Sequence, residues 1–416
     1  MRSKFASETA RISLPDARAA LLHHAEPLSL EMLSLEAGTG RVLARTYRSP
    51  EDLVPFARSA MDGYAMRATE TFGASVSRPC VLPVTGASFA GGGQITLSPA
   101  SACAITTGAM LPGGADAVVP FEDIERVGDT IVLRAPLRPL DHVFEPGDDA
   151  KRGDTLVVAG TVLSPGAAAL LASAGFAEIS TYRRPRVAIV STGDEVVAVA
   201  ATPRLGQIRN SNAAMLASIL AIDGATVVFS EHANDDAIAV RATLERALAS
   251  ADLVITTGGA STGERDYVKR VVCDLGAEFI FDSIALRPAK PTAFAALGKS
   301  VIAMLPGNPA AAYVAYVALV RGVVRGMSGL AQPYPPAIEA TLCGSIQRKP
   351  NRHFLMFASV TIAAGRLDVV PLENQCSSLV RTSADANALI VVEPGTETVS
   401  SGALVRCELV RGLGSC

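Results

Sequence analysis

The chain has 416 residues, of which 49% are hydrophobic, and its 37 basic and 40 acidic side chains give a net charge of −3. This length exceeds what one hydrophobic core usually serves, so we expect two to four domains. The charges are interspersed, which excludes the basic face that nucleic-acid binding needs and the polybasic patch of a membrane-surface protein. We therefore predict neither nucleic acid nor a membrane among its partners.

The cysteines and the N-terminal residues indicate a cytoplasmic protein. The cysteines are seven in number, lie far apart and form no C-x-x-C pair, which disfavours a zinc knuckle or a disulfide framework and favours reduced thiols. The first ten residues, MRSKFASETA, lack the apolar segment of a secretory signal. The longest apolar run, 310–320, is too short to span a bilayer.

The N-terminal segment is predicted to be helical between residues 11 and 46. One helix lies around Ala17–Leu22 and a second around Leu28–Leu35, which ends near two glycines. Residues 54–65, VPFARSAMDGYA, then form a loop. Its Asp62 is either a turn former before a glycine or a functional carboxylate, and turn chemistry alone favours the first.

Residues 76–133 predict a small β-rich domain, because short strands alternate with Gly and Pro and a hairpin turns at Gly128-Asp129. Inside it, Thr106, Thr107 and Gly108 offer hydroxyl and amide donors that suit an anion, although a plain turn explains them nearly as well. Residues 141–154 carry four Asp and one Glu, the usual composition of a solvated acidic loop. An apolar helix follows at 167–174.

Residues 186–326 predict a doubly wound α/β domain. Near-continuous apolar strands alternate with helical patterns, which is typical of a mostly parallel sheet covered on both faces. The strands are expected at Arg186–Ser191, Ala225–Ser230, Asp252–Thr257 and Ser300–Leu305, and the helices at 211–223, 235–250, 267–275 and 309–325.

Polar segments follow each of these strands, and the carboxyl ends of such strands share one ligand crevice. The segments are Thr192–Glu195, Asn234–Asp236, Thr257–Asp266 and Pro306–Pro309. Residues 256–266, TTGGASTGERD, stand out because their glycines allow positive φ and close backbone approach. We therefore predict a binding site for an anionic ligand at this edge of the sheet.

A basic segment and a C-terminal β domain complete the chain. LRPAKP at 286–291 holds Arg287 and Lys290 between prolines, which is either a stiffened anion contact or a surface loop. QPYPP at 332–336 indicates a linker, and the short strands after it predict a β-barrel or sandwich of about 80 residues.

Six motifs, taken in order, resemble one known family. They are SAMDGYA at 59–65, TTGAMLPGGADAVVPFED at 106–123, STGDE at 191–195, TGGASTGERDY at 257–267, RPAKP at 287–291 and LPGNP at 305–309. With these motifs the chain, from about residue 12 to 410, resembles the MoeA family, the molybdenum insertases of molybdenum-cofactor synthesis, which are related to the E domain of gephyrin.

The resemblance implies an elongated homodimer of four-domain subunits: a multidomain α/β fold with a central doubly wound, mostly parallel domain like the molybdopterin-binding fold. The implied domains are a helical linker and dimerisation domain (12–50 and 152–183), a small β-rich domain (54–150), the α/β domain (184–330) and a C-terminal β-barrel (337–412). The implied reaction takes adenylylated molybdopterin and molybdate and releases molybdenum cofactor and AMP. The implied cofactor is Mg²⁺, and the implied partners include the molybdopterin adenylyltransferase and acceptor molybdoenzymes.

The resemblance also assigns site residues by matching motifs. The catalytic carboxylates would be Asp62, Glu195, Asp235 and Asp266, of which the last three would hold Mg²⁺. A carboxylate about 4 Å from a phosphate oxygen costs on the order of 4 kcal/mol at an effective dielectric near 20, and an intervening divalent cation reverses that sign. Asp62 and Asp149 would come from one subunit and meet the α/β carboxylates of the other. Substrate contacts would come from Thr107, Asp149, Asn212, Gly258, Gly259, Ser261, Arg287, Lys290, Asn308, Arg352 and Ser377.

Four positions depart from the family pattern. The chain has Ser283 where a Lys is common, Ala289 where a Gly is usual, Phe144 where an Arg is customary, and Cys376 in place of the Gly of a Q-G-S motif. These departures keep two alternatives open beside molybdenum insertion: a non-catalytic carrier or scaffold for the cofactor, and a molybdopterin adenylyltransferase.

Overall fold

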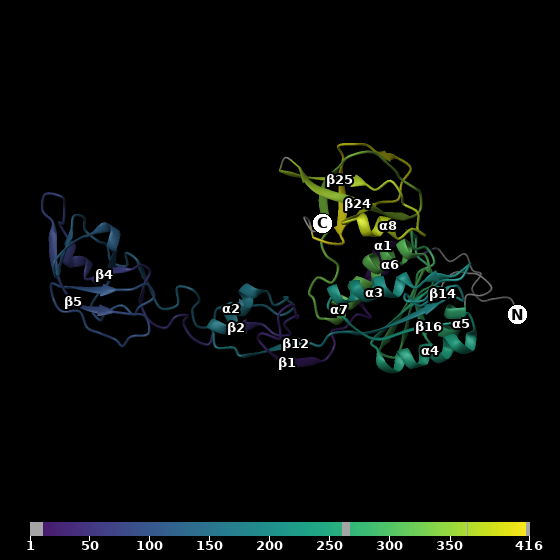
Figure 1. The fold of residues 1–416 in the computed structure, drawn as a ribbon, viewed down its shortest axis with the longest axis horizontal. Helices are drawn as coiled ribbons and strands as arrows, with labels where there is room; N and C mark the ends of the chain where they lie inside the picture. Colours follow the sequence, from purple (N-terminus) through teal and green to yellow (C-terminus); the bar gives the residue numbers. More distant parts are fainter. Residues whose placement is uncertain (1–10, 260–266, 364, 413–416) are drawn as a thin grey trace.

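The structure is a computed structural model, which describes residues 11–259, 267–363 and 365–412. The molecule is elongated (Figure 1). The strands around β4 and β5 form one end, α2, β1 and β12 lie in the middle, and the α/β layers and the C-terminal strands form the other end. This arrangement separates the predicted site residues of the β-rich part from those of the α/β part within one chain.

The α/β part contains a six-stranded, mostly parallel sheet in the order β16-β13-β17-β21-β20-β18. The strands from β16 to β21 run parallel, and β20 and β18 add antiparallel pairs at one edge. The bounds are β13 Arg186–Thr192, β16 Thr226–Ala233, β17 Leu253–Thr257, β18 Glu278–Phe281, β20 Ala293–Leu297 and β21 Ser300–Leu305. The four predicted strands are confirmed, whereas the two antiparallel strands are not among the predictions.

Helices cover both faces of this sheet because its strands are apolar on both sides. Val187 and Ile189 of β13 pack in one buried cluster, with α3, α6 and α7, whereas Ala188 and Val190 pack in another, with α4 and α5. The helices are α3 Ser211–Ile222, α4 Ala237–Ser250, α5 Tyr267–Asp274, α6 Pro309–Ala315, a π-helical turn Tyr316–Val320, and α7 Arg321–Met327; two short strands, β14 Val196–Val197 and β15 Ile208–Arg209, pair beside them.

The segment Pro309–Met327 is one continuous helical stretch of 19 residues, longer than the apolar run seen in the sequence. By length and composition it is the one helix of the described chain that could cross a membrane. In its apolar 18-residue window, 89% of the helix is buried inside the protein, so here it serves as a core helix of the α/β part.

The middle of the molecule is built from short elements of two segments that are distant in sequence, residues 30–48 and 155–182. They are β1 Leu30–Ser34, β2 Tyr47–Arg48, β11 Thr155–Val157, α2 Pro165–Ser173 and β12 Glu178–Tyr182. The prediction of a helix at Leu28–Leu35 is wrong: this segment contains β1, which pairs with β12 over its whole length. Leu28, Leu30 and Met32 alternate with polar residues, a period of two that suits a strand, and pairing with β12 satisfies the backbone.

The β-rich part contains a six-stranded sheet in the order β7-β4-β6-β5-β9-β8. The predicted hairpin at Gly128-Asp129 is confirmed as the β8–β9 pair. The bounds are β3 Arg58–Ser59, β4 Gly63–Met66, β5 Cys80–Ser88, β6 Ala102–Ile105, β7 Ala117–Pro120, β8 Glu125–Val127, β9 Thr130–Leu133 and β10 Val143–Phe144, with 3₁₀ turns at Ala68–Thr71 and Phe121–Asp123.

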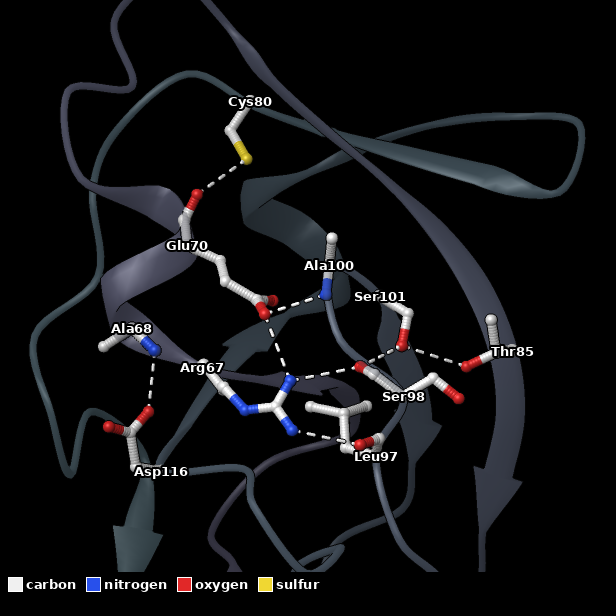
Figure 2. A network of polar contacts seen from close by, with 10 residues as sticks. All are labelled: Arg67, Ala68, Glu70, Cys80, Thr85, Leu97, Ser98, Ala100, Ser101 and Asp116. Carbon is white, nitrogen blue, oxygen red and sulfur yellow. Dashed lines mark hydrogen bonds and ion pairs between the residues drawn. The ribbon is translucent and has the colours of Figure 1, made fainter.

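A polar network ties the loops of this part together (Figure 2). The guanidinium of Arg67 donates to Glu70 at 3.1 Å and to the carbonyls of Leu97 and Ser98 at 3.0 and 3.1 Å. Asp116 accepts from a backbone N–H of the Ala68–Thr71 turn at 2.7 Å. Glu70 Oε1 and Asp116 each accept a backbone N–H group, at 2.8 and 2.7 Å, whereas the buried Glu70 Oε2 has no hydrogen-bond partner within the described chain. Because most of the network consists of side chains bonded to the backbone, we assign it a structural role.

The C-terminal strands form a closed five-stranded barrel in the order β24-β25-β22-β28-β26, with β26 pairing back to β24. The bounds are β19 Leu286–Arg287, which adds to β24, β22 Ile338–Leu342, β23 Ile346–Gln347, β24 His353–Ala363, β25 Arg366–Pro371, α8 Arg381–Asp385, β26 Ala388–Val392, β27 Thr398–Val399 and β28 Leu404–Leu409. Between the barrel and the sequence-based alternative of a sandwich, the structure decides for the barrel.

The N-terminal helix α1, Leu14–Leu22, packs on α7 and shares the buried cluster of the α/β sheet. Leu14, Ala17 and Leu21 are its buried residues, and Ser13 caps its first turn. The domain boundaries implied by the resemblance assign this helix to the linker domain instead, and those boundaries stay a prediction.

Candidate functional site

A cavity of about 610 Å³ lies at the carboxyl ends of the parallel strands. It is there because β13, β17 and β21 end together: Ser191 pairs with Thr257, which pairs with Leu305. The lining residues come from these strand ends, from the start of α3, and from the segment after β25: Ser191, Thr192, Glu195, Val196, Ile208, Arg209, Asn210, Ser211, Asn212, Thr257, Gly258, Gly259, Pro291, Pro306, Gly307, Asn308, Pro309, Ser378 and Val380.

Glu195 enters the cavity from the loop after β13. Gly193 begins this loop with φ of 131°, a conformation that suits glycine. The loop is held from the side by the next strand end: His232 Nε2 donates to the Gly193 carbonyl at 2.7 Å, and the Asp235 N–H donates to Asp194 at 3.0 Å. Asp235 therefore lies beside the loop that carries Glu195, although it does not itself line the cavity.

Two buried side-chain oxygens in the cavity wall have no hydrogen-bond partner within the described chain. Asn212 is 8% exposed and donates through Nδ2 to the Gly307 carbonyl at 2.8 Å, which leaves its Oδ1 unpaired. Thr192 Oγ1 is unpaired as well. Because an unpaired buried oxygen costs about 1–3 kcal/mol, a ligand that brings N–H or O–H donors to this wall is favoured.

Gly258 and Gly259 line the cavity, but their neighbours show a structural need for glycine. A Cβ at Gly258, where φ is 88°, would lie 2.7 Å from the Thr192 carbonyl oxygen, and one at Gly259 would lie 2.6 Å from Val268. The sequence suggests glycines for close approach to a ligand. In the structure they first allow β17 to end against β13.

The segment after β25 closes another side of the cavity. Asn308 Nδ2 donates to Ser377 Oγ at 3.4 Å, and the Ser377 carbonyl accepts from the Ala310 N–H at 3.0 Å. Gln375 exchanges hydrogen bonds with the backbone of Phe357 at 3.0 and 2.9 Å, which fixes this segment on the barrel. The predicted residues Asn308 and Ser377 are thus brought together.

The basic loop 287–291 separates this cavity from a smaller one of about 210 Å³. Pro291 lines the larger cavity, whereas Lys290 and Arg352 line the smaller, together with Arg11, Ile284, Ala285, Leu286, Pro350 and Asn351. Arg287 lies over the Phe354 ring at 5.0 Å. Ala289 adopts φ of 98°, where glycine is favoured, so this departure from the family pattern introduces backbone strain.

The other predicted residues lie elsewhere. Thr107 donates its N–H to Asp62 at 2.7 Å, so these two are neighbours, but they belong to the β-rich end of the molecule with β4 (Figure 1). Asp149 is exposed, next to the bridge between Leu53 and Ala150. Ser261 and Asp266 fall outside the described residues.

Sequence reasoning missed several polar residues of the cavity. Ser191 donates to Asn210 at 3.3 Å and accepts from Thr257 at 3.4 Å, and Asn210 also caps α3. The available signal was a pair of hydroxyl residues at the end of an otherwise apolar strand, where an apolar core would not demand them.

A doubly wound sheet with a polar cavity at its strand ends, joined to a β-barrel, defines the class of α/β proteins that bind polar ligands at the carboxyl edge of the sheet. Three family models match the chain: the MoeA N-terminal region (domain I and II) at residues 12–175, a probable molybdopterin binding domain at 188–326, and the MoeA C-terminal region (domain IV) at 339–410.

Curated relatives and solved structures agree with these matches. Molybdopterin molybdenumtransferase of Bacillus subtilis is 33% identical over 96% of this chain and 94% of the relative. Molybdopterin molybdenumtransferase 2 of Mycobacterium tuberculosis is 34% identical over 88% and 92%. A crystal structure of the molybdopterin biosynthesis MoeA protein of Pyrococcus horikoshii is 31% identical, with a TM-score of 0.80 over 97% of this chain and 100% of that one.

The chain therefore belongs to the MoeA family of molybdopterin molybdenumtransferases. The predictions of the family, of the fold class and of a molybdotransferase enzyme are confirmed. Membership supports a role in molybdenum cofactor biosynthesis.

Proposed function

We propose that this protein inserts molybdenum into adenylylated molybdopterin, using molybdate and Mg²⁺ and releasing molybdenum cofactor and AMP. The observation that carries the proposal is the pair of cavities on either side of the basic loop 287–291. One is large, polar and lined by a carboxylate, and the other is small and cationic. A large phosphorylated substrate and a small dianion need two such sites side by side.

The larger cavity is the site for the pterin substrate. Its volume of about 610 Å³ falls in the range of small-molecule sites. The unpaired oxygens of Asn212 and Thr192 accept from the N–H groups of a pterin ring. The hydroxyls and amide of Ser377, Ser378 and Asn308 at the rim are donors for phosphate oxygens.

The smaller cavity is the site for molybdate. Arg11, Lys290 and Arg352 are the cations in its lining, and none of the lining residues that the structure describes is acidic. Guanidinium and ammonium groups favour a tetrahedral dianion by charge and by multiple N–H donors. Because Lys290 and Pro291 are adjacent, a dianion held by Lys290 is presented to the larger cavity across the loop.

The oxygen donors of the larger cavity fit Mg²⁺. Glu195 offers a carboxylate, and the lining residues that the structure describes include no cysteine and no histidine. Within residues 11–259, 267–363 and 365–412, no group of three or more His, Cys, Asp or Glu side chains could hold a metal ion. Mg²⁺ usually uses one or two carboxylates plus water and phosphate oxygens. Glu195 lines the cavity and would hold the ion, which would neutralise phosphate charge. Asp235 lies beside the loop that carries Glu195 and outside the lining, so its part in holding the ion rests on the family resemblance.

Asp62, Thr107 and Asp149 take part through a homodimer. In one chain the β-rich part that carries Asp62 and Thr107 lies at the opposite end from the two cavities, which supports their delivery to the site of a second subunit (Figure 1). The cytoplasm, the molybdopterin adenylyltransferase and the acceptor molybdoenzymes remain the expected setting and partners.

The test is release of AMP from adenylylated molybdopterin, measured with and without molybdate and Mg²⁺. Glu195→Gln should abolish release, and Lys290→Met should raise the molybdate concentration needed for half-maximal rate. The matched control is Glu278→Gln, an exposed carboxylate on β18, at the far edge of the same sheet, which should leave the rate unchanged. Full activity of Glu195→Gln would contradict the site assignment.

The same experiment separates the alternatives. ATP consumption with molybdopterin in the absence of molybdate would indicate an adenylyltransferase. Tight binding of the finished cofactor without any AMP release would indicate a carrier or scaffold.

A further inference from the structure

A third cavity, of about 340 Å³, lies at the joint between the middle of the molecule and the α/β part. It is bounded by the residues after β1, by the end of β12, by the end of α3 and by α7, which lie close together in Figure 1. Its lining residues are Gly40, Arg41, Val42, Val162, Tyr182, Arg183, Arg184, Ile222, Asp223, Gly224, Arg325, Ser328 and Leu330.

This cavity is separate from the two cavities of the proposed reaction. Helix α3 begins in the lining of the larger cavity, at Ser211, and ends in the lining of this one, at Ile222. Its 12 residues rise about 18 Å. The proposed function leaves this cavity without a role.

Two of the four arginines in the lining already have partners. Arg41 pairs with Glu31 and donates to the Tyr182 carbonyl at 2.6 Å. Arg183 forms a two-pronged pair with Asp252 at 2.7 and 2.6 Å. These two guanidinium groups are therefore neutralised by the protein itself.

Among the described residues the lining contains one carboxylate, that of Asp223, and it has partners of its own. Asp223 Oδ2 accepts from Arg321 Nε and from the Tyr316 hydroxyl, each at 3.0 Å. Tyr316 and Arg321 are five residues apart, and the π-helical turn Tyr316–Val320 brings both to the same oxygen. Asp223 Oδ2 is thus paired with Arg321, and within the described residues no ion pair joins Asp223 to Arg325.

Arg325 and Arg184 remain. The side chain of Arg325 has no hydrogen-bond partner within the described chain, and its Nε is buried. Burial lowers the pKa of Arg325, and the nearby Asp223 only partly offsets this. Arg184 is exposed, and within the described residues its side chain makes no hydrogen bond either. The positive charges of Arg184 and Arg325 in the lining are therefore not balanced by an acidic partner among the described residues.

The end of α3 does not cancel this excess. A helix C-terminus is equivalent to roughly half a negative charge. Here the N–H groups of Asp223, Gly224 and Ala225 already donate to carbonyls of the last turn. Two guanidinium groups outweigh the remaining partial charge.

We propose that this cavity binds a phosphate monoester, with its dianionic phosphate between Arg184 and Arg325. The apolar side chains of Val42, Val162 and Leu330 line the same cavity and provide a surface for the organic part of the ligand. Because the cavity joins the β1–β12 region to α3 and α7, an occupied site cross-links the middle of the molecule to the α/β part.

The test uses phenyl phosphate as the probe, because it carries a dianionic phosphate on a small apolar body and lacks both pterin and adenine. Isothermal titration calorimetry of the full chain should show binding of phenyl phosphate, weaker binding of inorganic phosphate and none of phenol. Arg325→Met and Arg184→Gln should each weaken binding about tenfold or more, the loss of one charge-assisted hydrogen bond. Glu278→Gln, which removes an exposed carboxylate on β18, should bind phenyl phosphate as the wild type does.

Thermal melting supplies a second measurement, in which the effect of Arg325→Met on the melting temperature should differ between the free and the ligand-bound protein. Without ligand, Arg325→Met should melt at a higher temperature than wild type, because it removes a partly buried guanidinium that has no hydrogen-bond partner within the described chain. With phenyl phosphate at the same concentration, wild type should gain more stability than Arg325→Met. If Arg325→Met fails to fold, the exposed Arg184→Gln carries the test. No binding of phenyl phosphate by wild type, or unchanged affinity in the folded variants, overturns the proposal.

Discussion

Replacement of Gly258 by alanine should disrupt the strand ends that form the larger cavity. Its φ of 88° costs an alanine about 1–2 kcal/mol. The new Cβ would also lie 2.7 Å from the Thr192 carbonyl oxygen and 2.8 Å from Thr192 Oγ1. Thr192 ends β13, which is paired to β16 and β17 on both sides and cannot retreat freely. Relieving such a contact costs about 1–3 kcal/mol more, so we expect a total loss of about 2–5 kcal/mol.

Gly276→Ala is the matched control for this prediction. Gly276 has nearly the same φ, 84°, but nothing lies within 4 Å of the position its Cβ would take. It should therefore show the conformational cost alone, about 1–2 kcal/mol. At roughly 3 °C per kcal/mol, thermal melting of the full chain followed by circular dichroism should fall by about 3–6 °C for Gly276→Ala and by about 6–15 °C for Gly258→Ala.

Adding Thr192→Ala to Gly258→Ala should restore only part of the loss, because it removes Oγ1 and leaves the closer carbonyl oxygen in place. Equal melting temperatures for Gly258→Ala and Gly276→Ala would refute the steric reasoning.

Three further predictions concern residues that do not line the larger cavity. Tyr316→Phe removes the hydroxyl that donates to Asp223 at 3.0 Å. It should lower the free energy of unfolding, measured by urea denaturation, by about 1–2 kcal/mol. An unchanged free energy of unfolding would contradict a stabilising role for this hydrogen bond. Burial acts to raise the pKa of Asp252, but hydrogen bonds, chiefly from Arg183, outweigh it and hold the pKa below the usual value of an Asp side chain. The Asp252 carboxylate therefore stabilises the fold above about pH 4, and this contribution is lost as the pH falls through its folded pKa. Between about pH 5 and pH 2, the melting temperature of Asp252→Asn should consequently fall less than that of wild type. Burial raises the pKa of the Cys407 thiol to about 11, so native protein treated with N-ethylmaleimide should be modified at its exposed cysteines and not at Cys407, as read by peptide mass spectrometry.

The parallel part of the α/β sheet was predictable because strands buried on both faces must be apolar throughout. The bounds of β21, Ser300–Leu305, agree fully, and those of β13 differ by one residue. The helix predicted at Leu28–Leu35 was wrong because the local pattern there does not distinguish a helix from a strand. Four leucines and a methionine in eight residues satisfy a helical pattern, and the choice of a strand depends on pairing with β12, which lies nearly 150 residues away in the chain.

The candidate site was predictable to the extent that it consists of strand ends. Glu195, Asn212 and Asn308 follow apolar strands or begin helices, and all three line the larger cavity. The division of anion contacts into two cavities was not predictable, because Lys290 and Pro291 are neighbours in sequence and line different cavities. The structural need for Gly258 was hidden as well, since it arises from Thr192 on another strand.

The sequence by itself determined the family, the order of the elements and the polar residues at the strand ends, because these depend on local pattern and on motifs. Only the tertiary structure decided which of these residues share a cavity. It also placed Asp62 and Thr107, which belong to the part with β4, at the opposite end of the molecule from the α/β sheet. It alone decided that Arg325 has no hydrogen-bond partner among the described residues, while Asp223 accepts from Tyr316 and Arg321. The physical reason is that partners of charged and polar groups are set by packing between distant segments, which no local pattern encodes.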